Sequence, residues 1–348
     1  MSRINPEFSK ELRKYGAFDF NACYNCGNCT AVCSLSTAES SFPREMVRLS
    51  VLGLEEDIQA SLKPWECYYC GECSTLCPQE ADPGELMMSL RRYLTAKYDW
   101  TGLSGLLYKY LPLTLTAFVL TLMGVLYFAH AVDYELSTML HIGHIFEGIA
   151  IGTIGLFILL PNIARMWYFT IFKPKVKVPF SNYVKSMGEL FVHMFTQKRA
   201  LGCDDNQFRW FEHLILVLGY LSLLFTTVAL NWFSTSNILI ISFGYLVSVI
   251  VFIVTIDFVN SRIKKQKAVS QHSQPSDLFF VIWLFFMGFS AFMVRLFIDL
   301  NILETNKWLY IFHLTVLVQW ALIIVPFGKW THFLYRSFAM FFVKLKEG

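Results

Sequence analysis

The chain has 348 residues, of which 55% are hydrophobic and 33 are phenylalanine, and its formal net charge is +3. Residues 1–100 carry a net charge of −4 and residues 101–348 a net charge of +7. No groove-reading motif or basic aromatic face accompanies the positive charge, which argues against a nucleic-acid partner. Long apolar runs in the second part predict membrane helices rather than a large soluble core.

Residues 1–20 are polar, with no apolar targeting core. We therefore expect the N-terminus to stay in the cytoplasm. Eight of the nine cysteines follow, in two runs with the same C-x₂-C-x₂-C-x₃-C spacing. The runs are Cys23, Cys26, Cys29 and Cys33, then Cys67, Cys70, Cys73 and Cys77, which precedes Pro78.

This spacing is that of [4Fe–4S] cluster ligands, and in two-cluster ferredoxins the fourth cysteine of each run binds the other cluster. We therefore expect one cluster on Cys23, Cys26, Cys29 and Cys77, and a second on Cys67, Cys70, Cys73 and Cys33. Zinc knuckles and disulfides are the alternatives. Zinc sites usually have two separated C-x₂-C pairs, and disulfides need an oxidising compartment.

Helices are predicted between and after the two cysteine runs. One begins near Ser41 to Pro43 and ends at Gly53, a short one follows to about Lys63, and a last one runs from about Pro83 to Lys97. Because the connection between the runs is helical, the pattern predicts an all-α dicluster domain over residues 1–100. A small ferredoxin fold with β-strands is not favoured.

The surroundings of the cysteines carry a family resemblance. The matching segments are Pro43-Arg44-Glu45-Met46-Val47-Arg48, Gly53-Leu54-Glu55-Glu56, Trp65-Glu66-Cys67, Cys77-Pro78 and Leu90-Arg91-Arg92. In order and spacing they resemble the iron–sulfur C subunit of heterodisulfide reductase. The resemblance covers roughly residues 15–98.

Residues 101–348 are predicted to form a transmembrane domain of six helices, each about as long as the hydrocarbon core requires. The spans lie near 111–131, 144–167, 211–232, 238–260, 278–299 and 308–338, the last continuing past Pro326. Lysine and arginine concentrate in loops 173–210 and 261–277, whereas the opposite loops carry only Lys307. This asymmetry predicts that both termini are cytoplasmic. Loop 173–210 is also expected to hold an interfacial helix near 182–197.

Histidines inside membrane spans are candidate functional residues, because intramembrane polar groups are costly. We expect two haems b, each held by two histidines. His213 and His332 lie near the inner face and form the predicted inner pair. His313 lies near the outer face, where His144 is its predicted partner and His141 the rival. His130 also lies near the outer face, whereas His193 and His272 fall in loops and are interpreted as solvated or structural.

Other groups in the spans are candidates for the same chemistry. Gly148, Gly152 and Gly155 share a helix face with His144, where a flat porphyrin could lie against the backbone, although such a stripe also serves close helix packing. Glu147 and Arg295 lie at similar depth near the outer face. They are interpreted either as an ion pair or as a proton relay beside a quinone.

The membrane half carries a second resemblance. Cys203, Arg209-Trp210-Phe211-Glu212-His213, Gly219, His313-Leu314, Pro326-Phe327-Gly328-Lys329-Trp330-Thr331-His332 and Tyr335-Arg336 resemble the membrane cytochrome b component of heterodisulfide reductase, with the gamma component of nitrate reductase more distant. Cys203 is interpreted as a free structural thiol. The fused arrangement resembles the family of the C subunit of quinone-interacting membrane-bound oxidoreductase. This resemblance implies bis-histidine haem b and electron exchange with menaquinone or another quinone.

The expected function is that of an electron-transfer subunit in the cytoplasmic (inner) membrane. Electrons would pass between the quinone pool and cytoplasmic flavin and iron–sulfur partners that resemble the heterodisulfide reductase A subunit. No dinucleotide fingerprint and no nucleophile–base set is present, so substrate chemistry is expected on those partners. Two alternatives stay open. One is a subunit of another respiratory complex, such as an electron-transfer-flavoprotein:quinone oxidoreductase, and the other is an iron–sulfur membrane anchor without haem.

Overall fold

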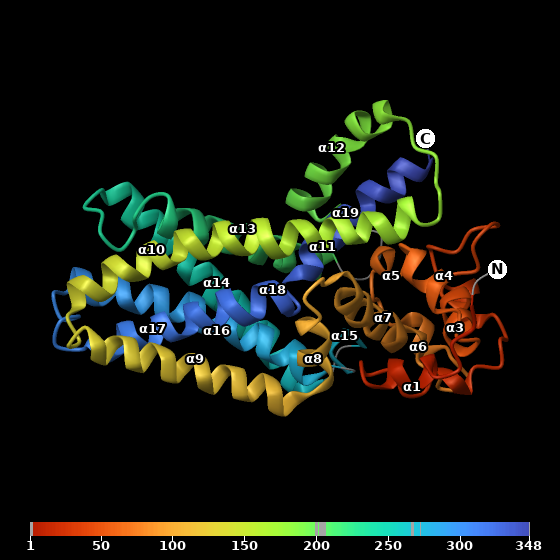
Figure 1. The fold of residues 1–348 in the computed structure, drawn as a ribbon, viewed down its shortest axis with the longest axis horizontal. Coiled ribbons are helices and arrows are strands. Elements are labelled where there is room, and N and C mark those ends of the chain that lie inside the picture. Colours follow the sequence, from red (N-terminus) through yellow and green to blue (C-terminus); the bar gives the residue numbers. More distant parts are fainter. Residues whose placement is uncertain (1–2, 199–200, 202–206, 266–267, 272, 348) are drawn as a thin grey trace.

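Helices make up every regular element of the described residues, and these residues contain no β-strand. The structure is a computed structural model and describes residues 3–198, 201, 207–265, 268–271 and 273–347. A domain of short helices lies at one end of the molecule and a bundle of long helices forms the rest (Figure 1). We call residues 3–100 the cysteine domain, because both cysteine runs lie in it.

The cysteine domain is built on its one long helix, α7 (Pro83–Tyr98). Pro83 begins this helix, at a position where a missing amide hydrogen costs nothing. Leu90, Tyr93, Leu94 and Tyr98 of α7 are fully buried. The short helices around it are α1 (Phe8–Arg13), η1 (Phe20–Ala22), α2 (Asn28–Ala31), α3 (Arg44–Val51), α4 (Glu55–Ala60), α5 (Lys63–Glu66) and α6 (Glu72–Thr75). The all-helical prediction for this part is confirmed.

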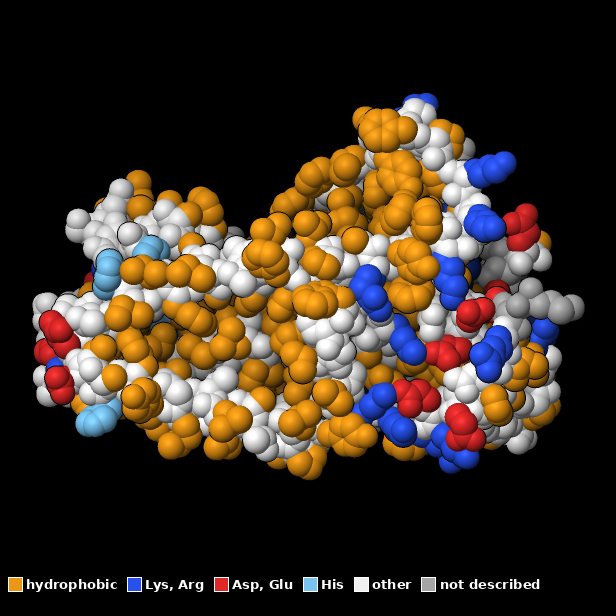
Figure 2. Space-filling view, viewed as in Figure 1, with side chains coloured by type: hydrophobic (Ala, Val, Ile, Leu, Met, Phe, Trp, Pro, Cys, Tyr) orange, Lys and Arg blue, Asp and Glu red, His pale blue; other side chains and the backbone are white. Residues whose placement is uncertain are grey.

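Six segments of the second part are long and apolar enough to cross a membrane, which indicates a multi-pass membrane protein. They are α9 (Leu111–Ala131), α10 to η3 (Leu136–Phe172), α13 (Gln207–Val228), α14 (Ile238–Lys264), α16 (Pro275–Asp299) and α17 to α19 (Lys307–Glu347). Within the bundle α14 packs against α13 and α16, and α17 packs against α16 and α9. Hydrophobic side chains cover the flank of the bundle in this view, whereas most acidic and basic ones gather over the end that holds the cysteine domain, with a smaller acidic group at the opposite end (Figure 2).

Bends and short connecting helices complete this part. The second segment is α10 (Leu136–Ile154), the π-helical turn η2 (Gly155–Leu159), α11 (Leu160–Trp167) and a second π-helical turn, η3 (Tyr168–Phe172). It is longer at both ends than the predicted span 144–167. The other short helices are α8 (Leu103–Lys109), α12 (Phe180–Thr196) and α15 (Ala268–Gln271). Helix α12 covers the region of the expected interfacial helix and exposes Phe180, Val184 and Phe191.

The last segment runs past Pro326, but it is interrupted there and is not one regular helix. It consists of α17 (Lys307–Gln319), the π-helical turn η6 (Trp320–Ile324) and α18 (Val325–Phe327), and Gly328 is extended. The Gly328 amide donates to the carbonyl of Ile324 and closes this helix end. A Cβ at Gly328 would lie 2.7 Å from the same oxygen. A new helix, α19 (Thr331–Glu347), then begins.

Helix α19 packs into the core of the cysteine domain. Tyr335 is fully buried, and its ring lies 5.5 Å from that of Trp65 and 5.3 Å from that of Tyr98. Ala339, Met340, Phe341, Phe342 and Leu345 join the same hydrophobic core. The N-terminal domain is therefore completed by the last helix of the chain.

Candidate functional site

The two cysteine runs have the same local geometry. In each, a glycine in the left-handed region precedes a short helix: Gly27 (φ +95°) before α2 and Gly71 (φ +93°) before α6. Only glycine adopts this conformation without a steric cost. The amide of Asn25 lies 3.4 Å from Cys23 Sγ, and that of Tyr69 lies 3.3 Å from Cys67 Sγ. Each loop therefore turns a backbone N–H toward its first thiol.

The thiols fall into two groups that mix the runs. Cys23, Cys26 and Cys77 lie close enough to Cys29 to raise its pKa, although burial is the larger cause. Burial is the main reason that the pKa of Cys73 is raised, and the nearby thiols of Cys67, Cys70, Cys33 and Cys29 add to it in that order. If the fourth cysteine of each run binds the cluster of the other run, Cys77 must lie near the first run and Cys33 near the second, as they do here. The ligand assignment itself stays a prediction.

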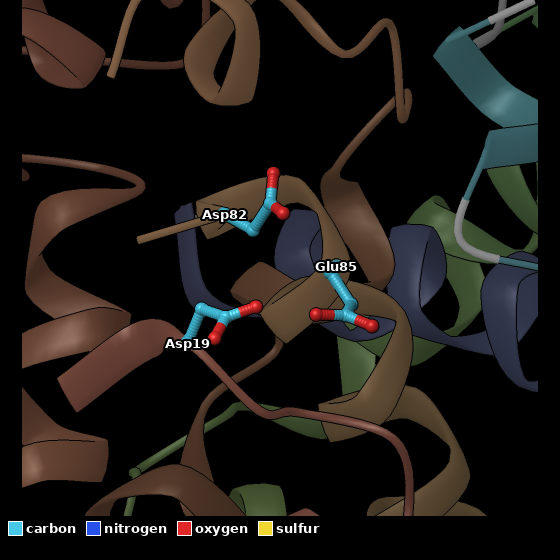
Figure 3. A group of neighbouring side chains, drawn as sticks. All are labelled: Asp19, Asp82 and Glu85. Carbon is cyan, nitrogen blue, oxygen red and sulfur yellow. The ribbon is translucent and has the colours of Figure 1, made fainter. Parts of the chain in front are cut away.

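Their mutual distances separate a cluster site from a single-ion site. Four thiolates on one zinc ion, with bonds of about 2.3 Å, would lie roughly 4 Å apart. Among the described residues, one group of His, Cys, Asp or Glu has all its ligand atoms within 4.8 Å of one another, and it contains no cysteine. The thiols are thus spread more widely than a zinc knuckle allows. That compact group is Asp19, Asp82 and Glu85, three carboxylates that face one another at the start of α7 (Figure 3).

Arg91 holds the second cysteine loop against α7. Its guanidinium is buried and donates from Nε to the carbonyl of Pro64, at 2.7 Å, and from Nη2 to the carbonyl of Cys67. Carbonyls at the end of a short helix need such a donor, because they have no partner within the helix. From the sequence, Arg91 stood out only as part of the segment Leu90-Arg91-Arg92, which carries a family resemblance. Its role follows from tertiary contacts.

The predicted inner histidines lie together at the end of the bundle next to the cysteine domain. The ring centres of His213 (α13) and His332 (α19) are 6.1 Å apart. Imidazoles bound to opposite faces of one iron through bonds of about 2 Å would have ring centres roughly 6 Å apart. His332 Nδ1 lies 2.6 Å from the Lys329 carbonyl oxygen. A donated Nδ1–H there leaves Nε2 as the ligand atom, so the pair fits a bis-histidine metal site.

His313 lies deeper in the bundle, on α17. It is buried, and its Nδ1 lies 2.8 Å from Ser290 Oγ, a partner that the sequence did not indicate. The ring faces an apolar cavity that is also lined by Glu147, Gly155 and Trp320. As for His332, the Nδ1 contact leaves Nε2 available as a ligand.

The predicted partners of His313 are placed differently. His141 is exposed, and His144 is half-buried with Nδ1 3.8 Å from Glu147 Oε2. Neither histidine lines the cavity beside His313. Gly148 and Gly152 are exposed on the outside of α10, whereas Gly155 lines the cavity. The structure thus brings Glu147 and Gly155 to His313 but not the two histidines.

Glu147 and Arg295 do not form the ion pair that was one of their two interpretations. Arg295 is buried on α16 and pairs with Asp299, at 2.6 Å between Nη2 and Oδ1. It also donates to the backbone carbonyls of Trp232 and Thr235. Glu147 faces His144 and the cavity instead. Arg295 therefore fastens the loop between α13 and α14.

His193 and His130 line neither the cavity of His213 and His332 nor that of His313. His193 lies on α12, with Nε2 3.5 Å from Glu189 Oε2. His130 lies near the end of α9, with its ring centre 6.1 Å from that of Tyr134. Cys203 and His272 fall outside the described residues.

One buried charge cluster at the junction of the two parts was not predicted from the sequence. Asp277, in the first turn of α16, lies 2.6 Å from Arg92 Nη2 and 2.7 Å from Lys329 Nζ. Arg92 also donates to the carbonyl of Tyr15. A charged residue at the start of an apolar span is a signal that the sequence contained. Its partners come from distant parts of the chain, so only the fold identifies them.

Comparison with protein families agrees with the geometry of the cysteine loops. The profile of the family described as "4Fe-4S dicluster domain" matches residues 22–81. Both cysteine runs lie within this range. The N-terminal part is a 4Fe-4S dicluster domain. This dicluster domain is the cysteine domain, residues 3–100.

Relatives with curated descriptions match about a quarter of the chain. A protein of Archaeoglobus profundus that is described as like the C subunit of heterodisulfide reductase is 29% identical over 98 residues, which are 28% of this chain and 52% of that protein. An iron–sulfur C subunit of the CoB–CoM heterodisulfide reductase of Methanocaldococcus jannaschii is 28% identical over 105 residues, 28% of this chain and 56% of that protein.

The C subunit of the H₂:CoB–CoM heterodisulfide,ferredoxin reductase of Methanothermobacter thermautotrophicus is 29% identical over 77 residues, 22% of this chain and 42% of that protein. The chain spans about half the length of the curated relatives it matches. No solved structure matches it. The comparisons therefore support an oxidoreductase-related, electron-transferring iron–sulfur subunit. The six apolar helices of the structure fit a membrane cytochrome b-like part.

Proposed function

We propose that this chain is a membrane subunit that passes electrons between the quinone pool and a cytoplasmic partner, through two [4Fe–4S] clusters and two haems b. The observation that carries the proposal is the position of the histidine pair. One cavity is lined both by Tyr68 and Tyr69, from the second cysteine loop, and by His213 and His332. A carrier held by the histidines would therefore adjoin the dicluster domain.

In this proposal the clusters take the two thiol sets predicted from the spacing. The inner haem would be held by His213 and His332. The outer one would be held by His313 with a second histidine, His144 or His141, neither of which lines the cavity beside His313 in the structure. Haem b supplies an iron that exchanges one electron at a time. Ser290 and the Lys329 carbonyl orient the rings of His313 and His332 and select Nε2 as the ligand atom.

In this proposal the quinone reacts near the outer face of the bundle, at the end away from the dicluster domain. Glu147 lines the apolar cavity beside His313 and is the proposed proton carrier for a quinone near the outer face. Arg295 does not line this cavity. It could affect the quinone function only through the loop between α13 and α14, whose backbone carbonyls it binds. Flavin-containing partners like the heterodisulfide reductase A subunit would bind the exposed face of the dicluster domain, so that substrate chemistry lies outside this chain.

The test is the haem content of the purified full-length protein, measured by reduced absorbance spectra. We expect about two haems per chain in the wild type. His213→Ala and His332→Ala should each lose about one haem, because a bis-histidine site fails when either ligand is lost. His130→Ala is the matched control, since this histidine is exposed near the end of α9 and lines neither the cavity of His213 and His332 nor that of His313. It should keep both haems. A wild type with normal iron–sulfur content and no haem absorbance would overturn the proposal.

A further inference from the structure

The buried carboxylate of Asp277 binds groups from three separate segments of the chain. Asp277 lies in the first turn of α16 and is 3% exposed. Its Oδ2 accepts the backbone amide of Gln274 at 3.1 Å and Arg92 Nη2 at 2.6 Å. Its Oδ1 lies 2.7 Å from Lys329 Nζ. Charge-assisted hydrogen bonds of this length are strong, so the carboxylate is fixed at the start of a long membrane helix.

Lys329 lies in the short turn between α18 and α19, and its carbonyl faces His332. That carbonyl oxygen accepts the backbone amide of His332 at 3.1 Å and lies 2.6 Å from its Nδ1. On either side of Lys329 the turn is closed by local bonds, in which Gly328 donates to Ile324 and accepts the hydroxyl of Thr331. The direction of the His332 ring therefore depends on where the backbone of Lys329 is held.

The side chain of Lys329 connects this turn to Asp277. It is 15% exposed, and among the described residues Asp277 is the carboxylate within ion-pair distance of it. An ammonium group that loses its counter-charge in a buried position is strongly destabilised. Without the carboxylate, the Lys329 side chain should move toward water, and the backbone of the turn should follow it.

The same contacts relate His332 to the dicluster domain. Arg92, which binds Asp277, belongs to α7 and also donates from Nη1 to the carbonyl of Tyr15 at 2.9 Å. On the other side of the histidine, Tyr335 packs into the core of the dicluster domain. His332 is therefore held before and after its own position in the chain by groups that contact this domain.

We propose that Asp277 is a positioning residue for the inner haem site. Through the side chain of Lys329 it fixes the carbonyl that bonds to His332 Nδ1, and so it fixes the direction of the ring that presents Nε2 to the iron. This inference rests on the proposed function, since it requires His332 to be an iron ligand. A hydrogen bond from Nδ1–H makes the ligand more basic, which favours ferric iron.

The test uses Asp277→Asn, Lys329→Met and the double variant in the full-length protein. The largest g value in the EPR spectrum of the ferric inner haem reports the orientation of its two imidazoles. All three variants should shift this g value in the same direction. The double variant should add nothing to either single one, because each breaks the same connection.

Redox titration of the haem absorbance provides a second measurement. The double variant removes one charge of each sign, so the effects of charge largely cancel. Its inner haem should become easier to reduce as the Nδ1 bond weakens, by up to about tenfold in the redox equilibrium, or about 59 mV for one electron. A purely electrostatic role predicts opposite shifts of potential in the two single variants and an unchanged g value, which would overturn the inference.

Two further variants control for structural effects. Lys344→Met removes another lysine of α19, one that pairs with Glu347 at the surface. It should leave the g value and the potential of the inner haem unchanged. Lys329→Arg keeps a cation for Asp277 and should keep most of the wild-type signal. The outer haem and the iron–sulfur content should be normal in every variant.

The outcomes distinguish this inference from the proposed function. If haem is present and the g value is the same in the wild type and in Lys329→Met, Asp277 does not position His332, while the haem proposal stands. Lys329→Met decides this even if Asp277→Asn fails to assemble, because it leaves the bond between Asp277 and Arg92 in place. Equal loss of both haems and of the clusters in Lys329→Met would show a role in folding and overturn the inference. A wild type without haem overturns both proposals.

Discussion

At the scale of single residues, Glu85 is a carboxyl group whose ionised form is destabilised by its surroundings. It is 5% exposed in the first turn of α7, and Asp19 and Asp82 face it (Figure 3). Burial is the largest effect on its pKa, and the two neighbouring carboxylates add to it. Together they raise the pKa of Glu85 to about 7 against the smaller opposing effects of the Phe18 amide and Arg92.

This raised pKa predicts how stability depends on pH. The unfolded chain releases the Glu85 proton near pH 4.5 and the folded protein near pH 7. Stability should therefore fall as pH rises between these values, and the whole cost remains above the higher one. Glu85→Gln should remove this dependence and raise the unfolding free energy at about pH 8 by roughly 1–3 kcal/mol.

The measurement is chemical unfolding of the detergent-solubilised protein at about pH 5 and about pH 8. Glu72→Gln is the control, because Glu72 is exposed in the first turn of α6. It should leave the pH dependence unchanged. An equal pH dependence in the wild type and in Glu85→Gln would show that Glu85 titrates normally.

At the scale of elements, the turn between α3 and α4 holds the first residues of the dicluster domain, around Asn5, against the rest of it. Gly53 has φ +69°, and its carbonyl accepts the amide of Asn5 at 2.8 Å. A Cβ there would lie 2.2 Å from the Asn5 carbonyl oxygen. Gly102 has a similar φ, +75°, but no atom lies within 4 Å of its Cβ position.

Alanine substitutions at these two glycines separate the cost of a strained backbone from the cost of a steric clash. Gly102→Ala should cost only the left-handed conformation, about 1 kcal/mol. Gly53→Ala should cost about 2–3 kcal/mol, because the N-terminal segment must also move. Thermal loss of the visible absorbance of the clusters measures both. If the two variants lose stability equally, the contact with Asn5 contributes nothing.

At the scale of the whole molecule, the distribution of charge predicts the orientation. Basic residues concentrate in the loops on the side of the dicluster domain, and the positive-inside rule places that side in the cytoplasm. A reporter enzyme that is active only in the cytoplasm should therefore work when fused after Gly348. The same reporter inserted in the loop 300–306, at the other end of the bundle, should be inactive. The opposite pattern would reverse the topology.

The features that could be read from the sequence are those set by nearby residues. Cysteine spacing and the glycine after Cys26 and Cys70 determine the loops locally, and apolar runs determine the six long segments. The extended conformation of Gly328 and the Asp277 charge cluster depend on contacts between distant segments. The same holds for the Nδ1 contact of His313 with Ser290, 23 residues away. His332 is different, because its partner carbonyl is three residues away, at a local spacing that the sequence already contains.

The burial of Tyr335 between Trp65 and Tyr98 has a consequence for biosynthesis. Ribosomes add about 5–20 residues per second, so the interval between residues 98 and 335 corresponds to roughly 12–50 s. During that interval the dicluster domain lacks the helix that closes its core. The hydrophobic side that α19 will cover waits until every membrane segment has been made. Closure of the hydrophobic core of this domain thus depends on α19, which follows the other apolar segments in the chain.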